Sequence, residues 1–329
     1  MKPWYAIFLI PVIFFSAAAL LSQYPVCGND IAEGIYPTYF YEECDDGNRI
    51  SGDGCSAECL LEFPEKIYVA PYMGNMEGGF SEEWFYFYDR LINFFETEHI
   101  SVGATTYPAS ILEKPEFAPY AKRLYESDYI ELVQKANTGL GEELRMDSLS
   151  YDGQKKIIKQ GQDTFRESMA QILDIPEGDV KLPFAYNQPQ GRFTNVTRQV
   201  IEDLGFKMFF EMYFNVDMDP VRSSETVDVL QYGVGFTIEG APGRKTAFYQ
   251  PREILEELRE INKTDVYMLD MNGDRIVPIW VHHMDFEHRN QHNVVDRIKW
   301  DIYTYVMRRI NQEPNLKFVS PTEIWYLRH

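Results

Sequence analysis

Short apolar runs alternate with longer amphipathic stretches along most of the chain after residue 63. In residues 82–96, for example, Trp84, Tyr88 and Leu91 recur at the spacing of one helical face. Runs rich in β-branched and aromatic residues, such as Ile67-Tyr68-Val69, are typical of buried strands. The expected strands cover residues 67–70, 100–106, 129–133, 180–182, 207–211, 234–238 and 278–281, and the expected helices cover residues 82–96, 118–126, 151–172, 194–204 and 293–310.

This alternation of strands and helices predicts the fold class, because it is typical of parallel β/α units. About seven such units favour a single barrel over an open doubly wound sheet. The chain also lacks the G-x-G-x-x-G and P-loop motifs of nucleotide-binding folds. We therefore expect an α/β protein with a distorted (β/α) barrel at residues 63–329, preceded by a small disulfide-rich module.

Residues 1–22 are expected to direct export. The run from Trp4 to Leu21 has no charged side chain and follows Lys2. A secretory signal has an apolar region of about 7–15 residues, whereas about 18 or more can remain as a membrane anchor. Pro11 and the small residues at 16–19 favour a cleaved or weakly anchoring segment, and both outcomes stay open. Either outcome predicts an extracellular or cell-surface protein.

Residues 23–62 form the expected cysteine-rich module. This segment holds the four cysteines of the chain, Cys27, Cys44, Cys55 and Cys59. Clustered cysteines in an exported chain indicate two disulfides, which replace the hydrophobic core that so short and polar a segment lacks. Four cysteines can pair in three ways, and all three stay open.

The same module places oxygen-bearing side chains at tight turns. The candidate ligands are Asp45, Asp46, Asn48 and Asp53. Converging carboxylate and amide oxygens suit a hard cation, so these residues are candidates for binding Ca²⁺. In the alternative interpretation the same side chains cap their own turns and bind no ion.

Charge narrows the range of partners. The chain has 31 basic and 51 acidic side chains, a formal net charge of -20 and a pI near 4.7. Such a surface repels phosphate backbones, which excludes nucleic acid as an expected partner.

The cysteine-rich module resembles a short repeat found on prokaryotic surface proteins. The resemblance rests on C-G-N at 27–29, E-E-C-D-D-G-N at 42–48, G-D-G-C-S at 52–56 and the final Cys59. It implies a stalk or an interaction module. The chain departs from the repeat in an aromatic insert, I-Y-P-T-Y-F-Y at 35–41.

Residues 63–329 resemble the NodB-homology polysaccharide deacetylases in the order of several motifs. These are S-V-G-A-T-T-Y at 101–107, I-E-L-V-Q at 130–134, L-P-F-A-Y-N at 182–187 with L-G-F at 204–206, V-H-H-M-D-F at 281–286, and T-E-I at 322–324. The resemblance implies a (β/α) barrel that removes acetyl groups from a glycan with the help of a metal ion.

The family's metal ligands do not recur at the matching positions. The family has two aspartates after its first strand and two histidines four positions apart after a later one. This chain has Ala70-Pro71-Tyr72 at the first place, and Lys135 and Gly139 at the second. A lysine ammonium repels a divalent ion, so we expect the zinc site to be lost.

His282 matches the family's general acid, and His282 and Asp285 are candidate catalytic residues; Glu77 is the candidate for a separate carboxylate mechanism. Three further histidines, His283, His288 and His292, could form a relocated metal site with His282 and Asp285, because imidazoles and a carboxylate bind transition metals. In the alternative, these histidines are solvated loop residues.

Glycan binding is expected at the ends of the barrel strands, where aromatic faces can stack on sugar rings. The candidates are Tyr72, Tyr107, Lys135, Tyr186, Arg192, Phe193 and Glu211. We expect an exported deacetylase-like protein that binds an N-acetylated glycan or envelope polysaccharide and has lost catalysis. An active hydrolase of non-peptide carbon–nitrogen bonds, using a relocated metal or Glu77, and a non-catalytic surface scaffold are the alternatives.

Overall fold

The computed structural model describes residues 26–37, 41–74, 82–138, 141–188, 194–211, 226, 228–231, 234–238, 247–260, 269–271, 274–287 and 294–329. The expected export segment at 1–22 lies outside these residues. Among the helices that are described, none is long and apolar enough to cross a membrane.

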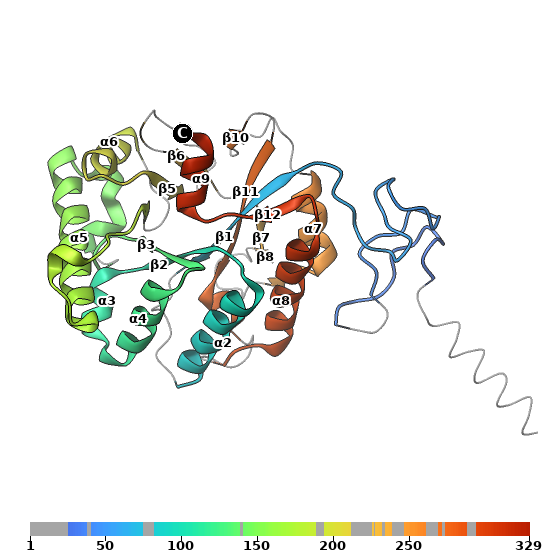
Figure 1. Ribbon diagram of the computed structural model, residues 1–329, viewed down its shortest axis with the longest axis horizontal. Coiled ribbons are helices and arrows are strands. Elements are labelled where there is room, and N and C mark those ends of the chain that lie inside the picture. The colour runs from blue at the N-terminus through green and yellow to red at the C-terminus, as the bar shows by residue number, and fades with distance from the viewer. Residues whose placement is uncertain are drawn as a thin grey trace, which may run out of the picture.

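The barrel is built from strands that alternate with helices, as the sequence pattern predicts (Figure 1). The strands are β1 (Ile67–Gly74), β2 (Val102–Thr106), β3 (Ile130–Gln134), β4 (Ala185–Asn187), β5 (Met208–Glu211), β6 (Asp228–Gln231), β7 (Val234–Gly235), β8 (Thr237–Ile238), β9 (Ala247–Phe248), β10 (Leu269–Met271), β11 (Asp274–His282) and β12 (Leu316–Phe318). The helices are α2 (Glu82–Glu98), α3 (Pro108–Glu113), α4 (Ala118–Glu126), α5 (Tyr151–Leu173), α6 (Asn195–Asp203), α7 (Pro251–Glu260), α8 (Arg297–Gln312) and α9 (Pro321–Arg328).

One curved sheet runs in the order β10-β11-β1-β2-β3-β4-β5-β6. All neighbouring pairs from β11 to β6 are parallel, and β10 is antiparallel to β11. Two short strands, β7 and β12, pair in parallel with β11 and β1. This half-barrel confirms the predicted distorted (β/α) barrel.

The expected strand at 180–182 is wrong. Residues 180–184 form no strand, and β4 begins at Ala185. Pro183 has no N–H to give to a ladder, and the N–H of Lys181 donates to the Tyr125 hydroxyl at 2.7 Å instead. The expected helix at 293–310 begins later, at Arg297, because the Asp296 side chain accepts hydrogen bonds from the N–H groups of the first turn.

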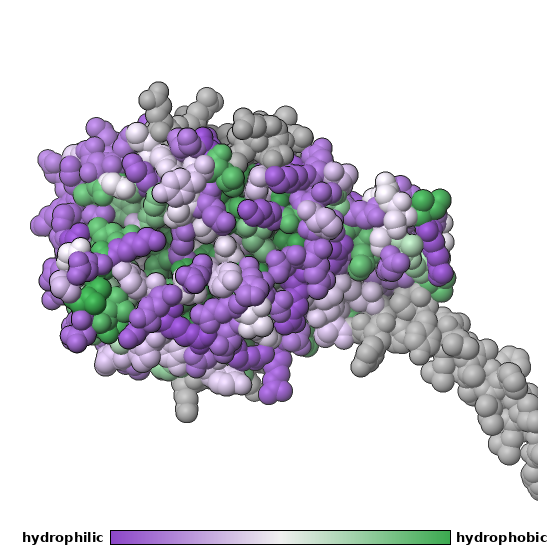
Figure 2. Space-filling view, viewed as in Figure 1, coloured by the Kyte–Doolittle hydropathy of each residue, from purple (hydrophilic) through white to green (hydrophobic). Residues whose placement is uncertain are grey.

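Alternation along β1 directs its side chains into two different parts of the core. Tyr68, Ala70 and Tyr72 of β1 face the inside of the barrel, whereas Val69 and Met73 pack under the helices. The inner cluster consists of Tyr68, Ala70, Tyr72, Val133, Ala185, Met208, Phe210, Ile276, Val319 and Ile324. Hydrophilic residues cover most of the barrel face seen in Figure 2, in keeping with the large negative charge.

Helix α9 seals the amino ends of the strands. Its Ile324 is fully buried in the inner cluster. Glu131 near the start of β3 accepts hydrogen bonds from the Ser320 hydroxyl at 2.7 Å and from the Thr322 N–H at 3.0 Å. At the other end of the helix, Arg328 forms an ion pair with the buried Asp228 of β6. Polar groups at this end of the barrel thus fasten the helix in place.

The cysteine-rich module contains the two predicted disulfides. They join Cys27 to Cys59 and Cys44 to Cys55, which selects one of the three pairings. The module lies beside α7 and α8, on one side of the barrel (Figure 1).

Candidate functional site

The mouth of the barrel, meaning the carboxyl ends of the parallel strands, brings together the ends of four family-like motifs, those that include β2, β3, β4 and β11. The T-E-I motif lies in α9 at the opposite end. The strand register places Gly74 of β1 opposite His282 of β11. On the other side, β1 pairs with β2 through Tyr72 and Gly103. Because every second residue of a strand faces the same way, the inward positions of β2 continue from Gly103 to Thr105.

The imidazole of His282 rests on the backbone of Gly74. A Cβ atom added to Gly74 would lie 2.9 Å from Cδ2 of His282, so a side chain at position 74 would displace the ring. The backbone N–H of His282 donates to Oδ2 of Asp285 at 2.7 Å. Asp285 is buried, and its carbonyl oxygen accepts from Nζ of Lys299 at 2.6 Å. These contacts hold Asp285 as a positioning group for the turn after β11.

Lys135 follows the end of β3 and is 3% exposed. Its Nζ lies 5.0 Å from the centroid of the Tyr107 ring, within the range of a cation–π interaction. Val133 faces the inside of the barrel and pairs with Ala185 of β4. Because side chains alternate along a strand, Lys135, two residues after Val133, also faces inward and lies level with Asn187 of β4. Nδ2 of Asn187 donates to the carbonyl of Phe210 at 2.7 Å.

Aromatic rings form the floor of the mouth. Tyr72 and Phe210 stack across the barrel with their centroids 4.8 Å apart. Trp280 packs against the same inner cluster and is partly exposed. The floor therefore combines flat apolar faces with Lys135 and His282, which are groups able to orient a sugar.

Tyr186 is not part of this floor. Its side chain is fully buried on the other side of β4, where it packs against Phe206 and Phe209. Its hydroxyl bonds to Oε1 of Gln188 at 2.8 Å. The error has a simple cause, because β4 begins later than expected and Tyr186 therefore lies within the strand and in the outward phase.

Glu77, Gly139, Arg192, Phe193, His288 and His292 lie outside the described residues. His283 is in the short helix after β11, and Glu211 ends β5. The sequence reasoning overlooked Gly74, Thr105, Asn187, Phe210 and Trp280, which the period-two pattern of inward positions could have identified.

In the cysteine-rich module, the candidate calcium ligands bond to their own turns. The Asp45 carboxylate accepts from the N–H groups of Gly28, Asn29, Asp30 and Gly47 at 2.8–3.0 Å. Desolvation raises the pKa of Asp45, but these four donors outweigh it, so the pKa lies below its usual value. Asp46 accepts from the Asn48 N–H at 3.2 Å, and the Asn48 amide donates to Asp53 at 3.1 Å. These contacts favour the turn-capping alternative.

Within the described part of the chain, one group of three potential metal-ligating side chains lies close together, formed by Glu42, Asp45 and Cys59. The Cys59 sulfur is in a disulfide and is not available as a thiolate. The group is therefore a poor candidate for a metal centre.

Two pockets lined by described residues lie away from the mouth. One, of about 220 Å³, is at the amino ends of β3 and β4 beside Glu131, Lys181 and Phe184. The other, of about 380 Å³, lies between the cysteine-rich module and the end of α8, beside Glu62 and Glu313.

Neither a protein-family model nor a curated protein matches the sequence. Solved structures do match. A proposed polysaccharide deacetylase from Mycobacterium smegmatis has a TM-score of 0.55 and 11% identity, over 82% of this chain and 92% of the other. A CE4 family pseudoenzyme from Bacillus anthracis has a TM-score of 0.45 and 10% identity, over 80% and 68%. An α-amylase from Thermotoga maritima has a TM-score of 0.49 and 9% identity, over 79% and 74%.

The likeness to the Mycobacterium smegmatis protein supports the half-barrel fold of this chain. The other two structures are too distant to add support. The half-barrel is thus similar to that of a polysaccharide deacetylase, as the motif order indicates. A shared fold leaves the activity open, because function depends on the residues at the site.

Proposed function

We propose that this chain is an exported deacetylase-like protein that binds an N-acetylated glycan at the mouth of its barrel and does not carry out the family's metal-dependent hydrolysis. The observation that carries the proposal is the composition of the mouth, where a buried lysine and stacked aromatic rings occupy the described floor. The two disulfides agree with export, since such bonds persist in oxidising compartments.

Lys135 argues against a metal at the inherited position. The sequence resemblance aligns this residue with a metal-binding histidine of the deacetylases. An ammonium group has no lone pair for a metal, and in a site of low dielectric it repels a divalent cation strongly. Tyr72 lies where the resemblance places the aspartates of the family, and it stacks on Phe210, which leaves an apolar surface where a carboxylate would be needed.

The same residues suit sugar binding. Trp280 is partly exposed, so its planar face can pack against the C–H groups of a pyranose ring, while Tyr72 and Phe210 are buried and stack on each other in the cluster that it packs against. Lys135 and His282 supply hydrogen-bond donors at the edge of this floor, and an acetamido carbonyl is a strong acceptor for them. The mouth therefore offers both parts of a small carbohydrate site.

The test combines binding, activity and metal content in the purified full-length protein. Calorimetric titration with an oligomer of N-acetylglucosamine should show binding that weakens by about tenfold or more in Lys135→Met. Lys155→Met is the matched control, because Lys155 lies on the outer surface of α5, and it should bind like the wild type.

Deacetylase assays and elemental analysis distinguish the alternatives. The proposal expects no release of acetate and no stoichiometric transition metal. Stoichiometric zinc that is lost in His282→Ala, together with acetate release, would establish the active hydrolase instead. The absence of glycan binding in the wild type would favour the surface scaffold.

A further inference from the structure

The aromatic insert of the cysteine-rich module packs against the barrel. The ring of Tyr36 lies 4.7 Å from that of Tyr305 in α8, and Tyr41 meets the same ring edge-on at 5.8 Å. Oε1 of Gln250, just before α7, accepts from the backbone N–H of Tyr36 at 2.9 Å. The insert that departs from the surface repeat thus supplies part of the contact with the barrel.

Two arginines of α7 bind backbone carbonyls of the module. Arg252 donates to the carbonyls of Ala32 at 2.8 Å and Gly34 at 3.2 Å, and Arg259 donates to that of Gly54 at 3.2 Å. Carbonyl oxygens keep fixed positions only in an ordered backbone. The module is therefore docked on α7 and α8 as a structured unit.

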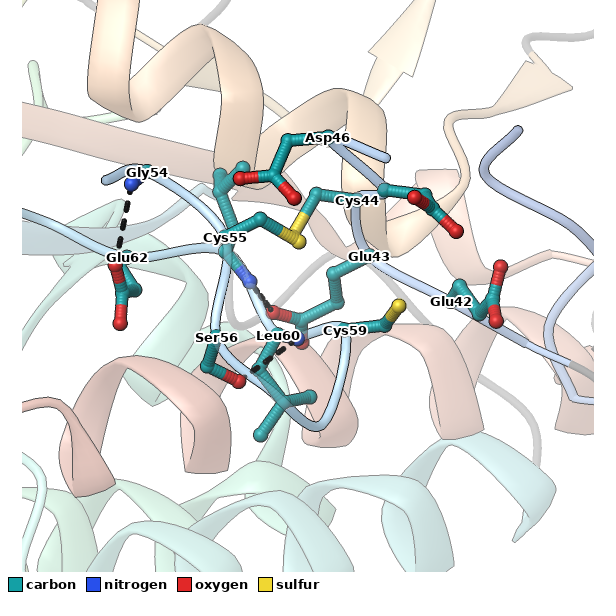
Figure 3. Close-up of a disulfide and its surroundings, with 12 residues drawn as sticks. Glu42, Glu43, Cys44, Asp46, Gly54, Cys55, Ser56, Cys59, Leu60 and Glu62 are labelled. Carbon is teal, nitrogen blue, oxygen red and sulfur yellow. Dashed lines mark hydrogen bonds between the residues drawn. A yellow bond between two sulfur atoms is a disulfide. The ribbon is translucent and has the colours of Figure 1, made fainter. Parts of the chain in front are cut away.

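Glu43 joins the module to α8, and its side chain lies next to the Cys44–Cys55 disulfide (Figure 3). Its side chain is fully buried. Oε1 accepts from the Tyr305 hydroxyl at 2.7 Å, and Oε2 accepts from Nε of Arg309 at 3.1 Å and from the Leu61 N–H at 2.9 Å. Arg309 also donates to the Leu61 carbonyl at 2.6 Å. Burial and the Glu43 carboxylate raise the pKa of Tyr305, so its hydroxyl stays protonated as a donor.

Both disulfides fix the position of Glu43. The next residue, Cys44, is bonded to Cys55. The backbone N–H groups of Glu43 and Cys44 donate to the carbonyl of Cys59 at 3.0 and 3.4 Å, and Cys59 is bonded to Cys27. Opening either bond therefore loosens a segment that holds the Glu43 carboxylate in place.

Arg309 connects this interface to the barrel sheet. It lies in the last turn of α8 and also pairs with Glu313 at 2.9 Å. The chain then passes Asn315, whose side chain donates to the Phe63 carbonyl at 2.6 Å, and enters β12, which pairs with the start of β1. The end of α8 is thus a direct link between the module and the sheet.

We propose that the two disulfides form a redox-dependent clamp on the barrel. With both bonds closed, Glu43 holds the end of α8 and the β12–β1 pairing. Each bond can be opened by a dithiol reductant, which gives two electrons and two protons to form two cysteine thiols and is itself oxidised to a disulfide. Glu43 then leaves its site, and residues 297–318 open locally while the rest of the barrel stays folded.

Two physical effects drive this opening. Reduction restores chain entropy to loops closed over 32 and 11 residues. It also removes one of the two carboxylates that pair with Arg309, whose side chain is 10% exposed; Glu313 remains, but the loss of the fully buried Glu43 partner destabilises the end of α8. The clamp is independent of glycan binding at the mouth.

Hydrogen exchange of the purified full-length protein tests the clamp. After reduction, residues 297–318 should exchange about tenfold or more faster, because local opening sets the rate of exchange. Residues 151–173 in α5, on the far side of the barrel in Figure 1, should change by less than about twofold. The paired variant Cys44→Ser/Cys55→Ser should show the same pattern without a reductant, so the result does not depend on access to the buried sulfurs.

Two side-chain variants make the test specific. In the oxidised protein, Glu43→Gln should produce part of the increase in hydrogen exchange at residues 297–318. Reducing the disulfides of this variant should then add less to the exchange rate than it does in the wild type. Glu62→Gln, whose carboxylate accepts from Gly52 and Gly54 inside the module, is the matched control and should change little. Unchanged exchange at 297–318 with four free thiols, or an equal increase in α5, would overturn the clamp.

Discussion

The two ends of the barrel use polar side chains in different ways. At the amino end, Glu131 and Asp228 hold α9 through hydrogen bonds and an ion pair, and Ile324 fills the inside. At the mouth, Lys135 is buried beside an aromatic ring, and His282 lies against a glycine backbone. The comparison indicates that the amino end is built for stability, whereas the mouth holds the groups to which we assign the proposed glycan binding.

The largest effect on stability should come from Ile324→Ala. Its side chain is fully buried within the barrel, so the cavity should lower the free energy of unfolding by about 2–5 kcal/mol. Urea unfolding measures this change. Glycan titration should show little change in affinity, and a large loss of affinity would contradict the separation of the two ends.

Gly74→Ala should be the most damaging small change at the mouth. The added methyl group would lie 2.9 Å from Cδ2 of His282, and such overpacking costs about 1–3 kcal/mol. The imidazole should move, which NMR detects as altered ring shifts of His282. In the control Gly178→Ala, no atom lies within 4 Å of the new methyl group, so His282 should keep its wild-type shifts.

Glu131→Gln should release part of the α9 anchor. In the variant, an amide NH₂ group replaces one of the two carboxylate oxygens that accept from Ser320 and Thr322, and an NH₂ group cannot accept a hydrogen bond. The free energy of unfolding should therefore fall by about 1–2 kcal/mol. Hydrogen exchange in residues 321–328 should rise. Glu126→Gln breaks an exposed ion pair with Lys122 and should cost less than about 1 kcal/mol. Equal effects of the two variants would show that Glu131 does not anchor the helix.

The smallest effect on stability is expected for Lys135→Met. Met keeps the length of the side chain, and the desolvation cost that is removed with the buried ammonium group offsets the contacts that it loses, so the free energy of unfolding should change by less than about 1 kcal/mol. Lys135→Met should nevertheless bind the glycan more weakly than the wild type does. A large loss of stability would mean that Lys135 belongs to the structural framework.

The sequence pattern predicted the barrel because the periods of 2 and 3.6 residues survive in long elements such as β11 and α5. It failed at β4, a strand of three residues preceded by Pro183, and so it assigned Tyr186 to the mouth. The contact between His282 and Gly74 depends on the register between β1 and β11. No local sequence pattern reveals this register. The same holds for Glu43 and Arg309, which are distant in sequence and meet only after folding.

The central claim is that the mouth binds an N-acetylated glycan. Hydrogen exchange with and without an oligomer of N-acetylglucosamine tests it most directly, because bound ligand slows local opening. We expect protection in residues 104–107, 133–138 and 280–287, at the carboxyl ends of the strands, and none in residues 316–328. Protection confined to residues 316–328 or to the cysteine-rich module would contradict the account.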